Sequence, residues 1–374
     1  MGPGLRLGPG VTLGADLSAS YLNTDNYFSS SESTTGANGY SLRPRAELRY
    51  DAGTTAAAWT SDLNYLKWDV PGALGNVVDY GSRVELNTRP LLRHFFSLTG
   101  GYRMGHDDAG SVRTEGVLAT DRLDRWRDTK GGINYRFGGI GARANVELSY
   151  SKQERQYTTN RSLTQLLDYT QDAAGYVLFY NYSPKTSWLL STDRINTRYA
   201  LTPTGFASRD AVEYRILTGL RWVATAKTQG DVRVGYFSRE PSDHGPADNG
   251  LDWKAAVQWQ PLSATRIALE TGRSSATSYR QDTLFNQNRT FGASWQQTLN
   301  ARLTASLAYN FVSSRFRGSS GLVDTYQNVS LRSDYSFSPR LSVFGGVGFA
   351  SKSSNQANRD YDALRGDIGF RLGL

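Results

Sequence analysis

The sequence predicts an all-β fold: a single transmembrane antiparallel β-barrel of about 18 strands, with short periplasmic turns and long extracellular loops. Apolar and polar residues alternate in segments of about ten residues that repeat from Val11 to Leu374, as expected of strands with one lipid-facing side. Long polar connections and very short turns alternate between these segments. The 22 Tyr and 8 Trp residues suit aromatic girdles at the two membrane interfaces.

Length and hydropathy support a single membrane domain. A soluble chain of 374 residues would usually divide into domains, but no linker is visible, so residues 1–374 are predicted to form one domain. The mean hydropathy is −0.50, and no apolar run approaches the ~18 residues of a membrane helix, which excludes helical spanning. A soluble β-sandwich or propeller would also have short strands, but it has no reason to gather Tyr and Trp at two fixed heights.

The segment 40–51 shows the repeating unit. One face carries Tyr40, Leu42, Pro44, Ala46, Leu48 and Tyr50, and the other carries Ser41, Arg43, Arg45, Glu47, Arg49 and Asp51. The first face suits lipid and the second suits water. Proline removes a ladder hydrogen bond, so Pro44 predicts a bulge or a local break in the ladder.

The same alternation assigns a lipid face to each strand in turn. In the first half the outward sets are Val11, Leu13, Ala15, Leu17, Ala19 and Tyr21; the Tyr40 set; Trp59, Leu63 and Tyr65; Val78, Tyr80, Val84 and Leu86; Phe96, Leu98, Tyr102 and Met104; Ile133, Tyr135 and Phe137; Ala142, Ala144, Val146, Leu148 and Tyr150; Tyr176, Leu178, Tyr180 and Tyr182; and Trp188, Leu190 and Thr192. The Tyr176 strand is ambiguous, because Val177 and Phe179 make both of its faces apolar.

The second half is more regular. Its outward sets are Val212, Tyr214, Ile216, Leu220 and Trp222; Val232, Val234 and Tyr236; Leu251, Trp253, Ala255, Val257 and Trp259; Ile267 and Leu269; Phe291, Ala293 and Trp295; Leu303, Ala305, Leu307, Tyr309 and Phe311; Val329, Leu331, Tyr335 and Phe337; Leu341, Val343, Val347 and Phe349; and Leu364, Ile368, Phe370, Leu372 and Leu374.

Loop length predicts the orientation, because outer-membrane barrels place short turns in the periplasm and long loops outside. The predicted long loops are 22–39, 68–77, 106–121, 151–168, 200–208, 239–250, 273–289, 312–324 and 350–360. The predicted turns are 51–53, 138–139, 183–184, 261–262, 300–301 and 338–339. Both termini are therefore expected in the periplasm. No plug-sized segment precedes Val11, so we expect an open lumen unless an external loop folds into it.

The water-facing positions are more basic than acidic, which favours anions in the pore. The residues predicted to line the pore are Arg43, Arg45, Glu47, Arg49, Arg83, Glu85, Arg103, Arg143, Glu147, Arg215, Arg221, Arg233, Lys254, Arg266, Arg332, Asp334, Arg365 and Arg371. The alternative is structural: opposite charges on neighbouring strands can form ladders that stiffen the wall. The alternation along their strands places Phe237 and Phe344 on the inner face, where their rings could stack on sugars. An error of one residue in the assigned register would turn either ring toward lipid.

The composition excludes several classes of site. Cysteine is absent, which excludes disulfides, thiolate metal sites and c-type haem attachment. No phosphate loop, zinc cluster or nucleotide fingerprint appears, so no cofactor or metal is expected. The net charge of +8 is spread along alternating strands, which disfavours nucleic-acid binding.

An enzyme is not expected either. Among the three histidines, His94, His106 and His244, only the Asp243–His244 pair resembles a catalytic motif, and it has no placed nucleophile. The same loop could offer oxygen ligands to calcium through Asp243, Asp248, Asn249 and Asp252, but it lacks EF-hand spacing. A solvated loop is the preferred interpretation.

The N-terminal segments Gly8-Pro9-Gly10-Val11, Thr24-Asp25-Asn26-Tyr27-Phe28 and Ser41-Leu42-Arg43-Pro44-Arg45-Ala46-Glu47-Leu48 are similar to the opening of the β-barrel porins of bacterial exopolysaccharide operons, the VpsM and EpsL type. The segment Tyr335-Ser336-Phe337-Ser338-Pro339-Arg340-Leu341-Ser342 resembles their strand-turn-strand repeats. Leu374 departs from the terminal aromatic residue that is usual in such barrels.

The resemblance implies export of an exopolysaccharide across the outer membrane. Its partners would be outer-membrane lipids, the polysaccharide cargo, a periplasmic polysaccharide export protein and, during biogenesis, the barrel-assembly machinery. A passive diffusion porin for small anions or sugars is the alternative, with a loop constriction in place of a wide channel.

Overall fold

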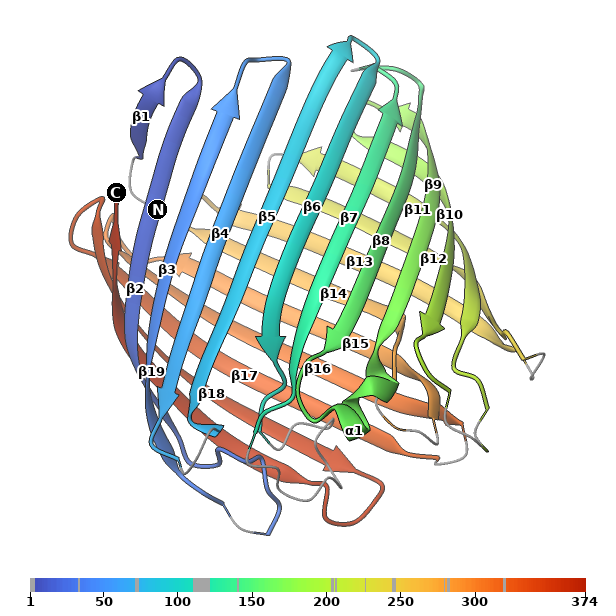
Figure 1. Ribbon diagram of the computed structural model, residues 1–374. Coiled ribbons are helices and arrows are strands. Elements are labelled where there is room, and N and C mark those ends of the chain that lie inside the picture. Colours follow the sequence, from blue (N-terminus) through green and yellow to red (C-terminus); the bar gives the residue numbers. More distant parts are fainter. Residues whose placement is uncertain are drawn as a thin grey trace.

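The computed structural model describes residues 4–32, 34–70, 74–109, 122–139, 141–202, 205, 207–225, 227–243, 247–278, 280, 283–318 and 321–374. They form a closed antiparallel barrel in which each strand from β2 to β19 pairs with its neighbour in sequence, and β19 pairs with β2 (Figure 1). The predicted fold and its 18 barrel strands are confirmed.

The strands are β1 (Leu5–Gly8), β2 (Val11–Thr24), β3 (Ala37–Asp51), β4 (Thr55–Trp68), β5 (Asn76–Leu91), β6 (His94–His106), β7 (Arg125–Phe137), β8 (Ala144–Tyr157), β9 (Tyr169–Ser183), β10 (Thr186–Tyr199), β11 (Ala211–Thr225), β12 (Thr228–Pro241), β13 (Asp248–Leu262), β14 (Thr265–Ala276), β15 (Thr283–Thr298), β16 (Leu303–Gly318), β17 (Val323–Ser336), β18 (Leu341–Ser354) and β19 (Tyr361–Gly373). A short helix α1 (Arg161–Thr164) and a 3-10 turn η2 (Gln165–Leu167) lie between β8 and β9. No described helix is long and apolar enough to cross a bilayer.

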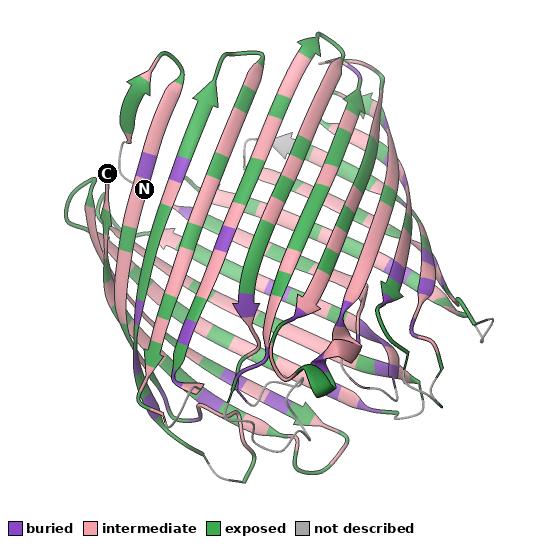
Figure 2. Cartoon of the chain, in the orientation of Figure 1, coloured by how far each residue is buried: buried purple, intermediate pink, exposed green. Residues whose placement is uncertain are grey.

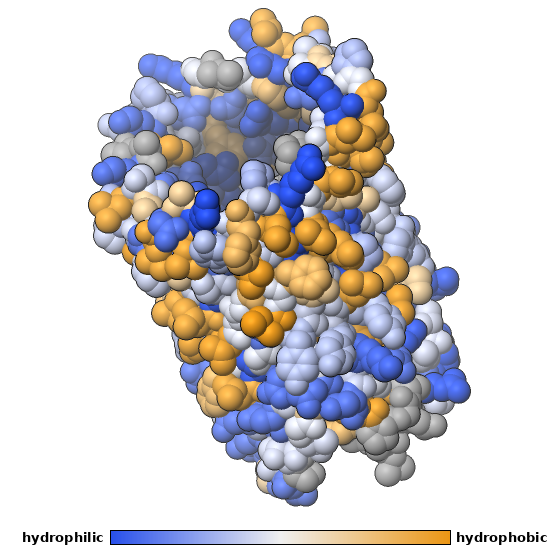
Figure 3. All heavy atoms as spheres, turned by 90° about the vertical axis from the view of Figure 1, so that its left-hand side faces the viewer, coloured by the Kyte–Doolittle hydropathy of each residue, from blue (hydrophilic) through white to orange (hydrophobic). Residues whose placement is uncertain are grey.

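The two faces of the strands separate as the alternation predicts. On β3, Tyr40 is 64% exposed and Leu48 37%, whereas Ser41 and Glu47 on the opposite face are 3% and 5% exposed. Hydrophobic side chains cover much of the outer wall, and hydrophilic side chains surround the opening at the short-turn end (Figure 3). The barrel is therefore apolar outside and polar inside, as a membrane-spanning barrel requires.

Pro44 coincides with a gap in the ladder between β3 and β4. The register runs from Leu42↔Tyr65 to Arg45↔Asp62 without pairs at the two positions between them, and it does not shift. On the other side Pro44 stays paired with Leu17 of β2. The predicted irregularity is thus a local ladder break, because proline has no N–H to donate there.

The predicted long loops are too long, because the strands continue into them. β8 reaches Tyr157, β16 reaches Gly318, and β15 already begins at Thr283. Beyond the apolar band both faces of a strand can be polar, so the alternation ends before the hydrogen bonding does. The turn predicted at 261–262 lies instead at 263–264, since β13 continues to Leu262.

Strand β1 is not predicted by the alternation, because four residues are too few to show a period. It pairs with β2 through Leu5↔Leu13 and Arg6↔Thr12, beyond the point where β19 ends. The Gly4 amide donates to the carbonyl oxygen of Leu374 at 3.0 Å, so β1 continues the line of β19 at the short-turn rim.

Buried residues gather toward the long-loop ends of the strands (Figure 2). Asn26 and Thr283 are 0% exposed and Arg209 is 3% exposed, and all three lie in or beside long connections. The loops therefore pack into the mouth of the barrel at that end.

Candidate functional site

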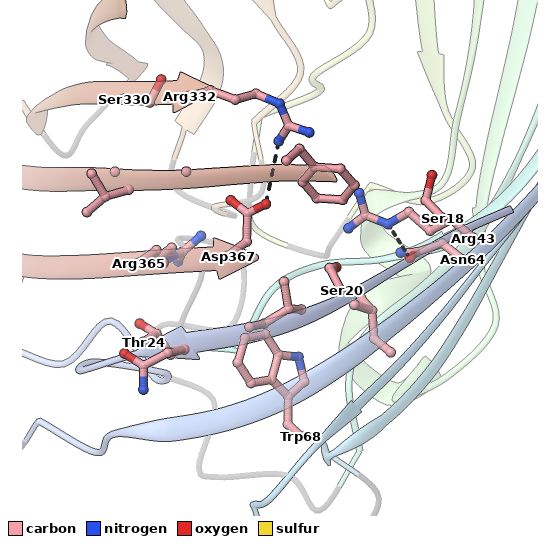
Figure 4. A pocket seen from close by; sticks show the side chains of 18 of the residues that line it. Ser18, Ser20, Thr24, Arg43, Asn64, Trp68, Ser330, Arg332, Arg365 and Asp367 are labelled. Carbon is pink, nitrogen blue, oxygen red and sulfur yellow. Dashed lines mark hydrogen bonds and ion pairs between the residues drawn. The ribbon is translucent and has the colours of Figure 1, made fainter. Parts of the chain in front are cut away.

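A cavity of about 950 Å³ opens on the inner wall where the barrel closes, along β2–β4 and β17–β19. Its lining includes the arginines Arg43, Arg45, Arg332, Arg365 and Arg371 and the acids Asp16, Asp62, Asp108 and Asp367. In Figure 4, side chains from β3 and β4 and side chains from β17 and β19 surround the same space.

Two of these arginines lie within 4.0 Å of carboxylates. Arg332 lies 3.1 Å from Asp334 through Nε and 3.5 Å from Asp367 through a terminal nitrogen. Arg45 lies 3.6 Å from Glu47. The contacts of these two arginines fit the alternative interpretation, in which opposite charges on the wall pair with each other and stiffen it.

The other three arginines bond only neutral groups or none. Nε of Arg43 donates to Oδ1 of Asn64 at 2.8 Å, and Nε of Arg371 donates to Oγ of Ser18 at 3.3 Å. Within the part of the chain that the structure describes, Arg43, Arg365 and Arg371 have no carboxylate within 4.0 Å. Their positive charge therefore faces the cavity.

Small residues on the same wall make room for the cavity. Gly346 lies opposite Arg332 and Asp367 in the register, and Gly348 lies opposite Ser330 and Arg365. Because a glycine adds no side chain, β18 leaves the space between the charged rows of β17 and β19 open.

The other predicted lining residues fall into three groups. Ion-paired residues are Arg49 with Glu47, Arg83 with Glu85 at 3.1 Å, Arg215 with Glu213 at 2.6 Å, and Arg221 and Arg233 with Asp231 at 2.9 and 2.7 Å. Arg103, Glu147, Lys254 and Arg266 lie on strands with no ion pair to a described residue. Arg143 lies in the connection between β7 and β8 rather than on a strand.

The inward aromatic residues are covered by arginines. Phe237 is 1% exposed beneath the guanidinium of Arg273, 3.5 Å from the ring centre. Phe344 lines the cavity, and Arg332 lies 4.3 Å above its ring. Phe179 is likewise buried under Arg221, which settles the ambiguous Tyr176 strand. These rings contact cations and do not offer free stacking surfaces for a sugar.

One loop cluster narrows the long-loop mouth beside the cavity. Tyr27, from the loop between β2 and β3, packs against Val77, Ala109 and Leu123 and also lines the cavity. Its hydroxyl donates to the carbonyl oxygen of Leu74 at 2.9 Å. Burial, with a smaller contribution from nearby Asp108, raises the pKa of Tyr27 to about 12.

A second loop cluster at this mouth is centred on Arg209 and joins three other connections. Arg209 donates to the carbonyl oxygen of Ser278 at 3.3 Å and to that of Leu166, and it lies 4.0 Å above the ring of Tyr199. Burial lowers the pKa of the Arg209 guanidinium. Sequence reasoning missed both clusters, because loop residues carry no periodicity and their partners are distant in sequence.

The residues considered for catalysis or calcium have other partners. Asp252 lies 3.5 Å from Arg215 and Asp248 lies 3.1 Å from Arg317, while Asp243 accepts from the Ser208 amide at 3.0 Å. His244 lies outside the described residues. Among the described residues, no group of three His, Cys, Asp or Glu side chains could hold a metal ion.

Nε2 of His106 lies 3.8 Å from Asp108, and His106 and His94 each contact one more polar side chain through Nδ1. Nδ1 of His106 lies 2.8 Å from Asp79, and Nδ1 of His94 lies 2.9 Å from the Tyr135 hydroxyl. Both pairs join side chains of the barrel wall.

Solved structures with a similar fold include a porin, an outer membrane protein and an iron transporter. The BenF-like porin of Pseudomonas fluorescens Pf-5 and Pseudomonas aeruginosa OpdK with vanillate are 12% and 11% identical, each at a TM-score of 0.52 over 97% of this chain and 99% of theirs. The apoprotein of the Neisseria meningitidis FrpB iron transporter, F5-1 variant, is 8% identical at a TM-score of 0.52, over 99% of this chain and 82% of its own. No curated protein has a similar sequence.

The family described as "Putative beta-barrel porin 2" matches residues 76–373, from β5 to the end of β19. This range covers most of the barrel, including its closure at β17–β19. The chain therefore belongs to the putative beta-barrel porin 2 family, and it is an integral protein of the outer membrane.

Proposed function

We propose that this protein is a passive diffusion porin whose lumen favours small anions over cations. The observation that carries the proposal is the set of three arginines, Arg43, Arg365 and Arg371, that face the cavity without a carboxylate partner. Positive side chains along an aqueous path attract anions and repel cations. The ion-paired arginines of the wall contribute much less, because their charge is compensated locally.

The proposed orientation places the long loops outside the cell and both termini in the periplasm. The lengths of the connections support this orientation. The short turns lie at the end of the barrel that holds the termini and the long loops lie at the opposite end, as in other outer-membrane barrels. Solutes would then enter past the clusters around Tyr27 and Arg209, which narrow the outer mouth.

Polysaccharide export is supported less well. It rests on the resemblance of the N-terminal segments, and it would require a wide path for a polymer through the long-loop end, where the loops pack inward. In that reading the short turns would dock a periplasmic export protein. A polymer of uronic acids, added on the short-turn side of a bilayer, would then block the current for times that grow with its length.

Ion selectivity tests the porin proposal. In a tenfold KCl gradient across a planar bilayer, the wild-type reversal potential should indicate chloride preference, and R43Q/R365Q/R371Q should shift it toward potassium. The matched control K152Q/R194Q/R198Q removes the same charge from the outer wall and should leave the potential unchanged. Equal potentials for the wild type and R43Q/R365Q/R371Q would refute the proposal.

A further inference from the structure

Basic side chains also gather on the outer wall, at the long-loop ends of β8–β10. Lys152, Arg194 and Arg198 are exposed and share the outward face of their strands with Tyr150 and Tyr180. We call Lys152, Arg194 and Arg198 the outer basic triad. No lumen function uses these residues, because they point away from the pore.

The triad surrounds a single acidic residue. Lys152 lies directly opposite Asp172 in the register, and Arg194 and Arg198 lie two positions to either side of Asn196, which faces Asp172 from β10. Asp172 accepts from Arg198 at 2.7 Å and from the Tyr150 hydroxyl at 2.9 Å. Its carboxylate is thus bonded by Arg198 and Tyr150, and among the described residues neither Lys152 nor Arg194 has a carboxylate within 4.0 Å.

The remaining charges nearby leave the patch positive. Arg127 on β7 is exposed and bonds the neutral Gln156, at 3.0 Å through its Nε. Glu154 is the only other carboxylate on this face of β7–β10 among the described residues, and it accepts from Gln156. The basic residues Arg127, Lys152, Arg194 and Arg198 therefore outnumber the two carboxylates of this face.

The height of the triad relative to the bilayer identifies its partner. Tyr150 and Tyr214 are 48% and 41% exposed, and they lie in the same cross-strand row as Arg194. Exposed tyrosines of membrane proteins lie at the level of the lipid headgroups. Arg194 therefore reaches the headgroups, and Lys152 and Arg198 lie farther out in the same layer.

We infer that the outer basic triad binds a phosphate-bearing lipid headgroup in the leaflet on the long-loop side. Arginine and lysine form charge-assisted hydrogen bonds to phosphate, and clustered basic residues beside a membrane bind anionic headgroups. The outward face of β11–β13 at the same height carries Glu240 and no basic residue, so these strands separate the triad from the exposed Arg289 and Arg315 on the outward face of β15 and β16.

Lipid binding to the detergent-purified barrel tests the inference by native mass spectrometry. The probes are a bis-phosphorylated saccharolipid, the same lipid without phosphates, and inorganic phosphate. The wild type should retain the phosphorylated lipid, and K152Q/R194Q/R198Q should bind it about 10- to 100-fold more weakly, as expected for three lost charges near a membrane surface. The variants K67Q, which removes a lone outer-face lysine on β4, and R43Q/R365Q/R371Q should bind as the wild type does.

Three outcomes would overturn the inference: equal binding of the dephosphorylated lipid, unchanged binding by K152Q/R194Q/R198Q, or displacement of the lipid by millimolar inorganic phosphate. If the triple variant does not fold, R194Q alone should weaken binding about fivefold. Conductance should stay at the wild-type value in either variant, so failure here is distinct from failure of the porin proposal.

Discussion

The side-chain amide of Asn26 donates a hydrogen bond of 2.8 Å to the carbonyl oxygen of Asp362, at the start of β19. The same amide donates to the carbonyl oxygen of Ser30 at 2.9 Å, and Oδ1 of Asn26 accepts from the Ser30 amide at 3.0 Å. Asn26 is 0% exposed, so its side-chain amide has no access to water. One side chain thus fixes the loop that carries Tyr27 to the strand that closes the barrel.

Replacing Asn26 should loosen this loop. N26A removes the three hydrogen bonds of this buried side chain, and it should lower the free energy of unfolding by about 1–3 kcal/mol. N26D retains only the acceptor and places a carboxylate beside carbonyl oxygens, so it should be at least as destabilising. Guanidinium unfolding in lipid vesicles, followed by tryptophan fluorescence, measures both.

The control for this prediction is N23A. Asn23 donates one exposed bond of 2.9 Å to Asn38, and its loss should change the stability by less than about 0.5 kcal/mol. Equal effects of N26A and N23A would show that the buried bonds do not fix the loop.

The raised pKa of Tyr27 predicts a loss of stability in strong alkali. The ordinary tyrosine pKa is near 10, and burial raises that of folded Tyr27 to about 12. Between these values the folded state binds more protons than the unfolded state, so the free energy of unfolding falls as the pH rises from about 10 to about 12. Below about 10 this contribution is fully present.

Unfolding curves at pH 9 to 12 check this sign. The free energy of unfolding of Y27F should fall less steeply over this range than that of the wild type, because phenylalanine has no proton to lose. Y182F, at a position that is 85% exposed, should follow the wild type. Parallel curves for Y27F and the wild type would contradict the prediction.

The barrel wall could be predicted from the sequence because every second side chain of a strand in the bilayer faces lipid and must be apolar. The exposed Tyr40 and the buried Glu47 follow that rule directly. The rule fails where lipid ends, so the alternation predicts a loop at residues 151–157 although β8 continues through them.

The ion pairs between side chains on the inner wall could be predicted only in part. Arg221 and Asp231 face each other across one hairpin, but their match depends on a register that the turn fixes, and Asp231 was not among the predicted lining residues. Parity alone cannot show that Arg45 has a carboxylate partner while Arg43 bonds Asn64. Arg209 was missed altogether, because its partners come from loops distant in sequence.

Glu213 should be the most sensitive carboxylate of the inner wall. It is 1% exposed, bonds Arg215 at 2.6 Å and lies 3.5 Å from Arg239. E213A leaves the buried charge of Arg239 uncompensated and should lower the free energy of unfolding by about 3 kcal/mol. E85A removes the carboxylate of the exposed Arg83–Glu85 pair and should cost less than about 1 kcal/mol.

The same unfolding assay distinguishes the two carboxylates, and conductance adds a second readout. Both variants remove one negative charge from the lumen, so any shared shift toward anion preference reflects charge alone. A cost for E213A as small as that for E85A would mean that water reaches Glu213 and screens its pairs.

Two glycines of the barrel wall should respond oppositely to a methyl group. At Gly219 on β11 a Cβ would overlap the carbonyl oxygen of Val232 on β12, whereas at Gly100 on β6 no atom lies within 4 Å of the added carbon. G219A must push two hydrogen-bonded strands apart, and it should cost about 1–3 kcal/mol. G100A should be neutral or stabilising by up to about 1 kcal/mol, because alanine restricts the unfolded chain without strain. Guanidinium midpoints in one lipid composition compare the two variants, and a G219A barrel as stable as the wild type would mean that β11 and β12 do not approach this closely.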